Sequence, residues 1–462
     1  MRAILTRRQI LGSALAGSAA TALAGAPALA AQRPIKVADL LRGSIDATQY
    51  GARPGAGDDQ SAVLQKALEL ATQEGRPLFL PPGRYQVSNL TLPAGAQLVG
   101  IAGGTRIEYR GGGHCIVAEN ADRITLSGLV IDGANRMLGD YTSGLVHLSN
   151  IATAILEDCE LQGSSKNGFS LERCGGRIER CTIGGAADAG ILSMEARGLA
   201  IRNNTVETCA NGGILVHRWS EGSDGTQVFG NRISAISARD GGTGQNGNGI
   251  NVFRAHDVMV ANNHIADCAF SAIRSNTGSN VQIANNTCLR SGETAIYSEF
   301  AFQGAVIANN IVDGAAKGIS ISNFREGGRL SVCSGNLVRN LVTVGPYPSS
   351  PPGFGWGIAA EADTVVTGNT IEGAPVFGIG LGWGPYLRNV AATGNILRLC
   401  GVGIAVSVVE GAEKTLISGN VISDSRLGAI IGYRWAEATT GDLSLSGADR
   451  YPHLTISNNT TM

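Results

Sequence analysis

One asparagine recurs at a fixed position of a short repeat, and this repeat limits the fold more than any other feature of the chain. The unit reads apolar-x-apolar-x-Asn-x-apolar, then a turn, then Gly-Ile-x-apolar. Most successive asparagines lie 23 to 33 residues apart, and a unit of that length must stack on its neighbours to bury its apolar residues. The recurring residues are Asn204, Asn231, Asn263, Asn286, Asn310, Asn336, Asn369, Asn395, Asn420 and Asn459.

The Gly-Ile half of the unit, as in Gly249-Ile250-Asn251-Val252, alternates with period two. The isoleucine and the residue two positions later therefore face a core, while the residues between and after them face outward. Each unit is too short for a β-α-β crossover, so we expect a coil of two or three short strands that pair in parallel with the next coil. The asparagines would then form a ladder of side-chain amides that satisfies buried turn backbone. The sequence does not contain the Leu-x-x-Leu-x-Leu frame of a leucine-rich repeat. Its units are also shorter than the blades of a β-propeller.

Residues 1–30 have the pattern of a twin-arginine signal peptide. Thr6-Arg7-Arg8-Gln9-Ile10-Leu11 precedes a short apolar run, and Ala28-Leu29-Ala30 has the form of a cleavage site. We therefore expect the twin-arginine translocase as a partner during export, a periplasmic or secreted location, and no membrane span in the mature chain. Removing the leader changes the formal charge from −1 to −4, so no basic surplus indicates nucleic acid.

The segment that follows differs from the repeats. Asp59 to Thr72 has the apolar spacing of an amphipathic helix, with Asp58 as its expected N-cap. Such a helix would cover the open end of the coil and its exposed strand edge. We expect residues 31–110 to form this cap and the first coils, and residues 111–462 to form the repetitive coil.

The motifs of this entry segment resemble a known superfamily. Ala47-x-x-Tyr50-Gly51-Ala52, Gly57-Asp58-Asp59-x-x-Ala62 and Gly75-x-x-Leu78-x-Leu80-Pro81-x-Gly83-x-Tyr85 resemble the entry segment of pectate-lyase-like proteins. With the leader and the asparagine repeats, the whole mature chain resembles the family of twin-arginine-translocated repetitive proteins. The resemblance implies an all-β fold, a single-stranded right-handed parallel β-helix with an N-terminal capping helix. It does not imply a reaction, and the Gly-His-Gly, paired-Asp and Arg-x-x-Arg motifs of pectin enzymes are missing.

The outward positions of the Gly-Ile strands predict one polar face in the middle of the coil. Rungs about 4.8 Å apart would bring six side chains together on this face, namely His217, Asn251, Arg274, Asn276, Tyr297 and Glu299. The insertion Ser220–Asn248 would border this face, and several aromatic side chains could stack on sugar rings. The predicted catalytic residues are His217, Arg274, Tyr297 and Glu299, and the predicted substrate-binding residues are Asn251, Arg254, Asn276, Arg218, Trp219 and Glu361. The aromatic candidates are Trp219, Phe300, Phe302, Trp356, Trp383 and Trp435.

Two reactions on an acidic polysaccharide fit these residues. The first is β-elimination or C5 epimerisation of a uronic acid, in which Arg274, Arg254 or Asn251 neutralises the carboxylate. Tyr297 or His217 would then move the proton, and an adjacent arginine should lower the pKa of the tyrosine. The second is hydrolysis with inversion by Glu299 and Glu361, two rungs or roughly 9–10 Å apart. We favour the first, and a non-catalytic glycan-binding or envelope protein is the remaining alternative.

No metal or redox cofactor has a recognisable motif, although calcium at an acidic loop is possible. The nine cysteines are odd in number and follow the repeat, as Cys209, Cys268 and Cys400 do at five residues after an asparagine. We expect them to be small buried residues in interior columns rather than disulfides. A disulfide between the stacked Cys159 and Cys181 is the main exception.

Overall fold

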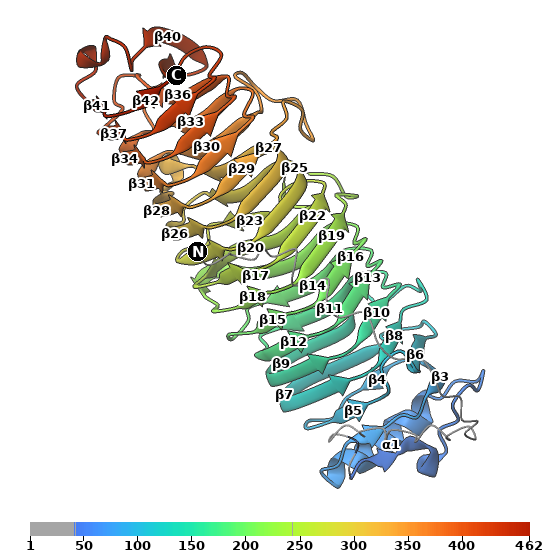
Figure 1. Cartoon of the computed structure of the whole chain (residues 1–462). Coiled ribbons are helices and arrows are strands. Elements are labelled where there is room, and N and C mark those ends of the chain that lie inside the picture. The colour runs from blue at the N-terminus through green and yellow to red at the C-terminus, as the bar shows by residue number, and fades with distance from the viewer. Residues whose placement is uncertain (1–40, 42, 243) are drawn as a thin grey trace, which may run out of the picture. The chain divides into compact units, whose positions relative to one another are not determined.

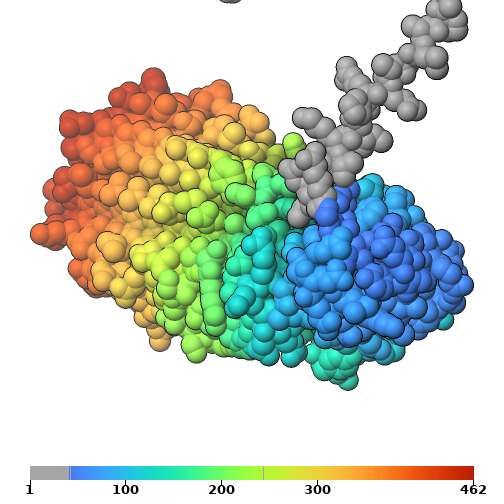
Figure 2. Space-filling view, turned by 90° about the horizontal axis from the view of Figure 1, so that it is seen from below, coloured from blue at the N-terminus to red at the C-terminus, as the bar shows by residue number. Residues whose placement is uncertain are grey.

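A computed structural model describes residues 41, 43–242 and 244–462, and the predicted signal peptide lies outside these ranges. Residues 43–462 form one compact unit, a right-handed parallel β-helix whose strands follow one another rung after rung in Figure 1. The coil predicted from the repeat and the right-handed parallel β-helix implied by the resemblance are therefore confirmed. In the space-filling view the colours also follow in sequence order, because each coil packs on its neighbours in the chain (Figure 2). None of the described helices is both long and apolar enough to cross a bilayer.

Each coil contributes strands to three parallel sheets. The first, which we call the site sheet, carries the Gly-Ile strands. It contains β4 (Leu90–Thr91), β7 (Ile116–Ser127), β9 (Gly144–Glu157), β11 (Asn167–Glu172), β14 (Ala189–Met194), β17 (Gly212–Ser223), β20 (Asn248–His256), β23 (Ile273–Asn276), β25 (Thr287–Glu299), β27 (Ile311–Ile321), β30 (Trp356–Ala360), β33 (Phe377–Leu381), β36 (Val402–Ser407) and β39 (Ile430–Arg434).

The second sheet precedes each asparagine and also receives the later parts of β7 and β9. It contains β1 (Ile45–Asp46), β2 (Leu78–Phe79), β5 (Gln97–Val99), β12 (Gly176–Glu179), β15 (Ala200–Arg202), β18 (Gln227–Phe229), β21 (Met259–Ala261), β24 (Val281–Ala284), β26 (Gln303–Ala308), β28 (Arg329–Ser334), β31 (Ala362–Thr367), β34 (Arg388–Thr393), β37 (Thr415–Ser418) and β41 (Leu454–Ser457).

The third sheet follows each asparagine and also receives the first residues of β25 and β27. It contains β3 (Gly83–Val87), β6 (Thr105–Tyr109), β8 (Val130–Asp132), β10 (Glu160–Gln162), β13 (Thr182–Gly184), β16 (Thr205–Glu207), β19 (Arg232–Ile236), β22 (His264–Cys268), β29 (Leu337–Arg339), β32 (Thr370–Glu372), β35 (Ile396–Arg398), β38 (Val421–Ser423) and β42 (Thr460–Thr461).

The asparagine ladder runs between the second and third sheets as predicted. Asn310 donates from its amide to the carbonyl of Ile283 and to Oδ1 of Asn336, both at 3.0 Å. Its own Oδ1 accepts from the backbone and the amide of Asn286 at 2.9 and 3.0 Å. The residue before each ladder asparagine takes a left-handed conformation, as Gly335 does at φ +65°, and glycine or asparagine tolerates this conformation best. The Asn-Asn and Gly-Asn pairs in the sequence follow from this turn.

The cap helix α1 (Ser61–Gln73) lies at the N-terminal end of the coil (Figure 1). Its predicted apolar face is buried, with Leu64, Ala67, Leu68 and Ala71 in the common core. The predicted N-cap is wrong, because the side chain of Asp58 pairs with Arg53. The Asp59 carboxylate instead accepts from the backbone of Ser61 at 2.9 Å, so the helix begins two residues later than expected.

The cysteines pack inside the coil. All nine are free and buried, which confirms the interior interpretation and excludes the Cys159–Cys181 disulfide. Burial raises the pKa of the Cys268 thiol to about 12, because a thiolate would lose its hydration there.

The ladder leads to a stability prediction. Asn310→Ala should lower the free energy of unfolding by roughly 2–4 kcal/mol, because it leaves the buried carbonyl of Ile283 and the N–H of Asn286 without these partners and also removes the bond to Asn336 on the next coil. Asn459→Ala is the matched control, since Asn459 ends the ladder, is half-buried and, among the described residues, bonds through its side chain to the preceding coil alone. Urea unfolding of both variants measures the difference, and equal losses would contradict a cooperative ladder.

Cysteine chemistry gives a second prediction. Without reductant, the native protein should take up no thiol reagent, and the protein unfolded in denaturant should take up nine equivalents, because each thiol is buried and unbonded. Mass spectrometry after alkylation counts them. Seven equivalents in denaturant would indicate a disulfide.

Candidate active site on the site sheet

The predicted register of the outward columns is confirmed. Asn251, Arg274 and Tyr297 pair in order across β20, β23 and β25, and Ser320 and Ala359 continue this column on β27 and β30. A second column, three residues after each isoleucine, runs through His217, Phe253, Asn276 and Glu299. Parallel pairing thus brings side chains from distant repeats onto adjacent rungs of one face.

Arg274 is held by two carboxylates. Its Nε lies 2.6 Å from Oε1 of Glu299, and its Nη1 lies 3.7 Å from Oε2 of Glu293. Asn276 also donates to Glu299 at 3.1 Å, and Glu299 is only 3 % exposed. Because both carboxylates balance the guanidinium within the protein, Arg274 has little charge left for a substrate carboxylate. Glu299 serves here to fix Arg274, and it lines neither of the two hollows described below.

Tyr297 differs from the sequence expectation. The Arg274 guanidinium lies 5.2 Å from the centre of its ring, as predicted for neighbours. The pKa of Tyr297 is nevertheless raised to about 12, first by burial and then by the nearby Glu299 carboxylate, and Arg274 offsets only part of this. The expected lowering by arginine is wrong because burial outweighs a cation already paired with acids. Tyr297 is therefore a neutral phenol, suited to give a proton rather than to take one.

A hollow of about 420 Å³ opens on the C-terminal side of Tyr297, and we call it the Lys317 hollow. Lys317, Ser320, Ser322 and Glu361 line it together with Tyr297. Burial lowers the pKa of Lys317, whose ammonium lies 4.9 Å from the ring centre of Trp356. Burial also raises the pKa of Glu361 to about 7, although its carboxylate accepts from the backbone of Phe324 at 2.7 Å. A cation, a carboxyl that titrates near neutrality and a phenol thus share one hollow.

A second hollow of about 360 Å³ lies on the N-terminal side of Arg274, and we call it the His217 hollow. It contains His217, Asn251, Arg274 and Asn276, with Gly244 and Gln245 from the predicted insertion at its edge. The ring of His217 packs edge-on against Phe253 at 5.6 Å between centroids, and burial lowers its pKa to about 4. His217 is thus a neutral imidazole. An added Cβ on Gly244 would lie 1.5 Å from Nη1 of Arg274, so this close approach requires glycine.

Three predicted binding residues line neither hollow. Arg218 forms an ion pair with Glu195 at 2.5 Å. Arg254 donates to the carbonyl of Trp219 at 2.6 Å, and the ring of Trp219 lies 5.5 Å from the guanidinium of Arg173. These residues lie where the pairing of β17 with β20 departs from the regular register. The direction of their side chains predicted from the repeat is therefore wrong. Among the aromatic candidates, Phe302 is fully buried in the core and available to no ligand.

Sequence reasoning missed Glu293, Lys317 and Tyr347. Lys317 lies two residues before Ile319, in a third outward column that also contains Thr294 and Trp356. Alignment of the residues before each isoleucine would have found it. Tyr347 lies in the segment between β29 and β30, where its hydroxyl bonds to Glu293 and its neighbours up to Phe354 wall the Lys317 hollow. The path of this irregular segment has no signal in the repeat.

Comparisons with known proteins agree on the fold. A family model described as periplasmic copper-binding protein (NosD) matches residues 100–299. The A-module of the mannuronan C-5 epimerase AlgE6 of Azotobacter vinelandii is similar in structure, with a TM-score of 0.53 and 16 % identity over 91 % of this chain and 99 % of that one. The pre-mature gene product 12 of bacteriophage phi29 has a TM-score of 0.51 and 13 % identity over 90 % and 72 % of the two chains. No curated protein sequence matches.

The residues do not fit a copper site. Within residues 43–242 and 244–462, no group of three or more histidine, cysteine, aspartate or glutamate side chains is placed to hold a metal ion. The cysteines, which would be preferred soft ligands, point into the coil. His217 packs on Phe253 rather than on a second ligand. We therefore assign no step to copper.

The buried carboxyl of Glu361 predicts a pH-dependent stability. Because its pKa in the folded state is raised to about 7, the folded protein binds a proton that the unfolded chain releases near pH 4.5. Folding stability should therefore fall as pH rises between these values, by up to about 3 kcal/mol. Glu361→Gln should remove this fall, so thermal unfolding at pH 5 and pH 8 compares the two proteins. Glu437→Gln, on the exposed strand β40 (Glu437–Asp442), should follow the wild type.

Proposed function

We propose that this protein is an exported carbohydrate-active enzyme that acts on uronic acid residues of an acidic polysaccharide, by β-elimination or C5 epimerisation. The observation that carries the proposal is the presence of Lys317, Glu361 and Tyr297 in one hollow. Both reactions begin with loss of the proton at C5, which is acidic only when the adjacent carboxylate is neutralised. The twin-arginine leader in the sequence and the periplasmic description of the matching family model support a periplasmic or secreted location.

Each side chain has a role in this scheme. The Lys317 ammonium pairs with the substrate carboxylate and stabilises the charge that develops when C5 loses its proton. Glu361 accepts that proton, since a carboxyl with a pKa of about 7 is an effective base at neutral pH. Tyr297 then donates the phenolic proton, to the departing oxygen at C4 in elimination or to the opposite face of C5 in epimerisation. Arg274 and Glu299 are positioning residues that hold Tyr297.

The neighbouring His217 hollow extends the same face. The side-chain oxygen of Asn251 is buried there without a hydrogen-bond partner among the described residues, and so is Nε2 of His217. Unpaired polar atoms at such a site are suited to sugar hydroxyl groups. We assign His217, Asn251 and Asn276 to substrate binding. The similarity to an epimerase structure supports the fold of this chain, and it gives no evidence for the proposed reaction.

Inverting hydrolysis has less support. It needs Glu299 and Glu361 on either side of one sugar, with room for water between them. Glu299 is instead bonded to Arg274 and Asn276 and lines neither hollow. The hydrolase alternative therefore lacks its second free carboxyl.

Activity assays test the proposal. The mature protein should release unsaturated products, seen by ultraviolet absorbance, or exchange the C5 proton with deuterated water, seen by NMR, on at least one of alginate, pectin, hyaluronan and glucuronan. Lys317→Ala, Tyr297→Phe and Glu361→Gln should each reduce kcat/KM by about 10²–10⁴-fold, because each removes a group that acts in proton transfer or charge stabilisation.

Arg290→Ala is the matched control, since Arg290 is exposed and pairs with Asp267 on the third sheet. It should keep full activity. Binding of a uronate polymer without either product would make the protein a glycan-binding protein. New reducing ends on a neutral glycan would favour a hydrolase.

A further inference from the structure

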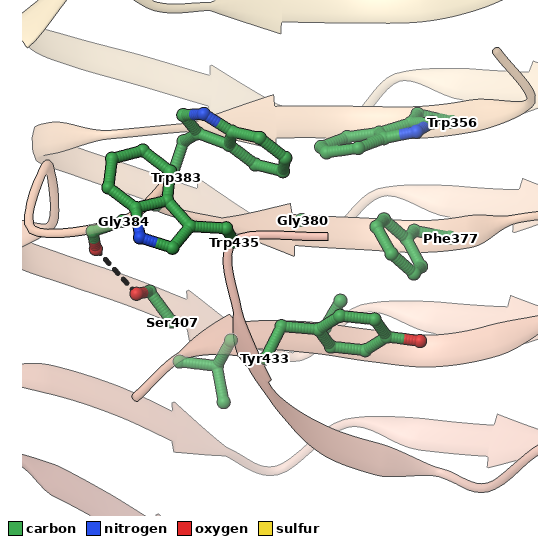
Figure 3. Close-up of a pocket in the computed structure, with 11 residues that line it drawn as sticks. Trp356, Phe377, Gly380, Trp383, Gly384, Ser407, Tyr433 and Trp435 are labelled. Atoms are coloured by element: carbon green, nitrogen blue, oxygen red, sulfur yellow. Dashed lines mark hydrogen bonds between the residues drawn. The ribbon is translucent and has the colours of Figure 1, made fainter. Parts of the chain in front are cut away.

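Five aromatic side chains continue the site sheet on the C-terminal side of the Lys317 hollow. We call this group the aromatic platform, and it consists of Trp356, Phe377, Trp383, Tyr433 and Trp435. Figure 3 shows the rings over adjacent strands, with Trp383 next to Trp435 and Phe377 next to Tyr433. The ring centroids of these two pairs lie 5.8 and 4.8 Å apart.

The platform is continuous with the proposed active site. Trp356 and Trp383 line the Lys317 hollow as well as the narrow crevice among the platform rings. The crevice holds only about 10 Å³, so a ligand would lie on the rings rather than between them. From β30 to β39 the sheet advances three rungs, or roughly 14 Å, enough for about three sugar residues in a row.

Two glycines provide the space that the aromatic rings occupy. An added Cβ on Gly380 would lie 2.8 Å from the ring of Trp356, and one on Gly384 would lie 2.4 Å from the ring of Trp435. The carbonyl of Gly384 accepts from the hydroxyl of Ser407 at 2.5 Å, as drawn in Figure 3, and this bond fixes the turn beneath Trp435. The glycines therefore allow the aromatic rings to lie against the sheet.

Trp383 and Trp435 lie at two positions where antiparallel turns interrupt the regular coil. Among the described residues, antiparallel pairing occurs only between β39 and β40 and between Trp383 and Tyr386. Trp435 forms the turn of the β39–β40 hairpin at φ +55°, where asparagine or glycine would be less strained. It is 47 % exposed. A strained, exposed tryptophan in a departure from the repeat indicates a function in binding.

We infer that the aromatic platform binds the sugar rings of a polysaccharide that extends from the Lys317 hollow toward the C-terminal end of the coil, with Trp383 and Trp435 stacking on the outermost rings. This inference rests on the proposed function for the occupant of the hollow. Aromatic rings provide a rigid apolar face, which suits the CH face of a pyranose, while polar groups of the sugar stay in water. The platform thus selects long chains over short ones.

Binding of oligosaccharides of increasing length tests the inference. Glu361→Gln is used as the background, so that no turnover disturbs the titration, and the probes are alginate oligosaccharides and cello-oligosaccharides of two to eight residues, about the span of hollow and platform together. In this background, affinity for one series should rise with length and then level off. Trp435→Asn should lose about tenfold in affinity for the long members and nothing for the disaccharide.

Controls separate the possible outcomes. Asparagine tolerates the left-handed turn, so Trp435→Asn should keep the thermal unfolding temperature, and Trp383→Ala should repeat its loss of affinity. Phe229→Ala removes an exposed aromatic on the second sheet and should change nothing. Equal affinities of the background and platform variants at every length would overturn the inference, while loss of turnover in the Lys317 variant would still support the proposed function. Cello-oligosaccharides could instead bind with an affinity that Trp435→Asn and Trp383→Ala reduce, while no uronate polymer is turned over. This result would support sugar binding by the aromatic platform and refute the proposed function.

Discussion

The register of the coils is the constraint on which the rest of this structure depends. Parallel strands repeat it through backbone hydrogen bonds. From Asn204 to Asn459 the asparagine ladder also fixes it at one turn of each coil, where side-chain amides bond each coil to the next. A slip of one residue would turn isoleucines outward and charged residues inward. The ladder therefore determines which side chains from distant repeats meet on the site sheet.

Ion pairing then separates the polar face of the site sheet into a part whose charges are neutralised within the protein and a part whose charges are not. Burial of ions is costly unless they are paired, and Arg274 is paired on both sides by Glu293 and Glu299. Lys317 on β27 and Glu361, directly after β30, come from neighbouring coils and line one hollow with fewer ionic partners, so burial lowers the pKa of Lys317 and raises that of Glu361. The same desolvation that costs stability makes these two groups suited to proton transfer.

The candidate functional features are concentrated where the repeat is interrupted. The insertion that contains Gly244 borders the His217 hollow, and the segment around Tyr347 walls the Lys317 hollow. Trp383 and Trp435 depend on two short antiparallel turns. A regular coil supplies a rigid surface, and the irregular segments supply its clefts and its exposed rings.

The sequence by itself determined the coil, its ladder, its register and the buried state of the cysteines, because each follows from a periodic pattern of local contacts. It also placed Tyr297 and Arg274 on one face. The tertiary structure alone decided that Glu299 is a partner of Arg274, that Arg218, Trp219 and Arg254 turn away, and that Lys317 and Glu361 share a hollow. Burial and ion pairing act between residues far apart in the chain, so no repeat pattern records them.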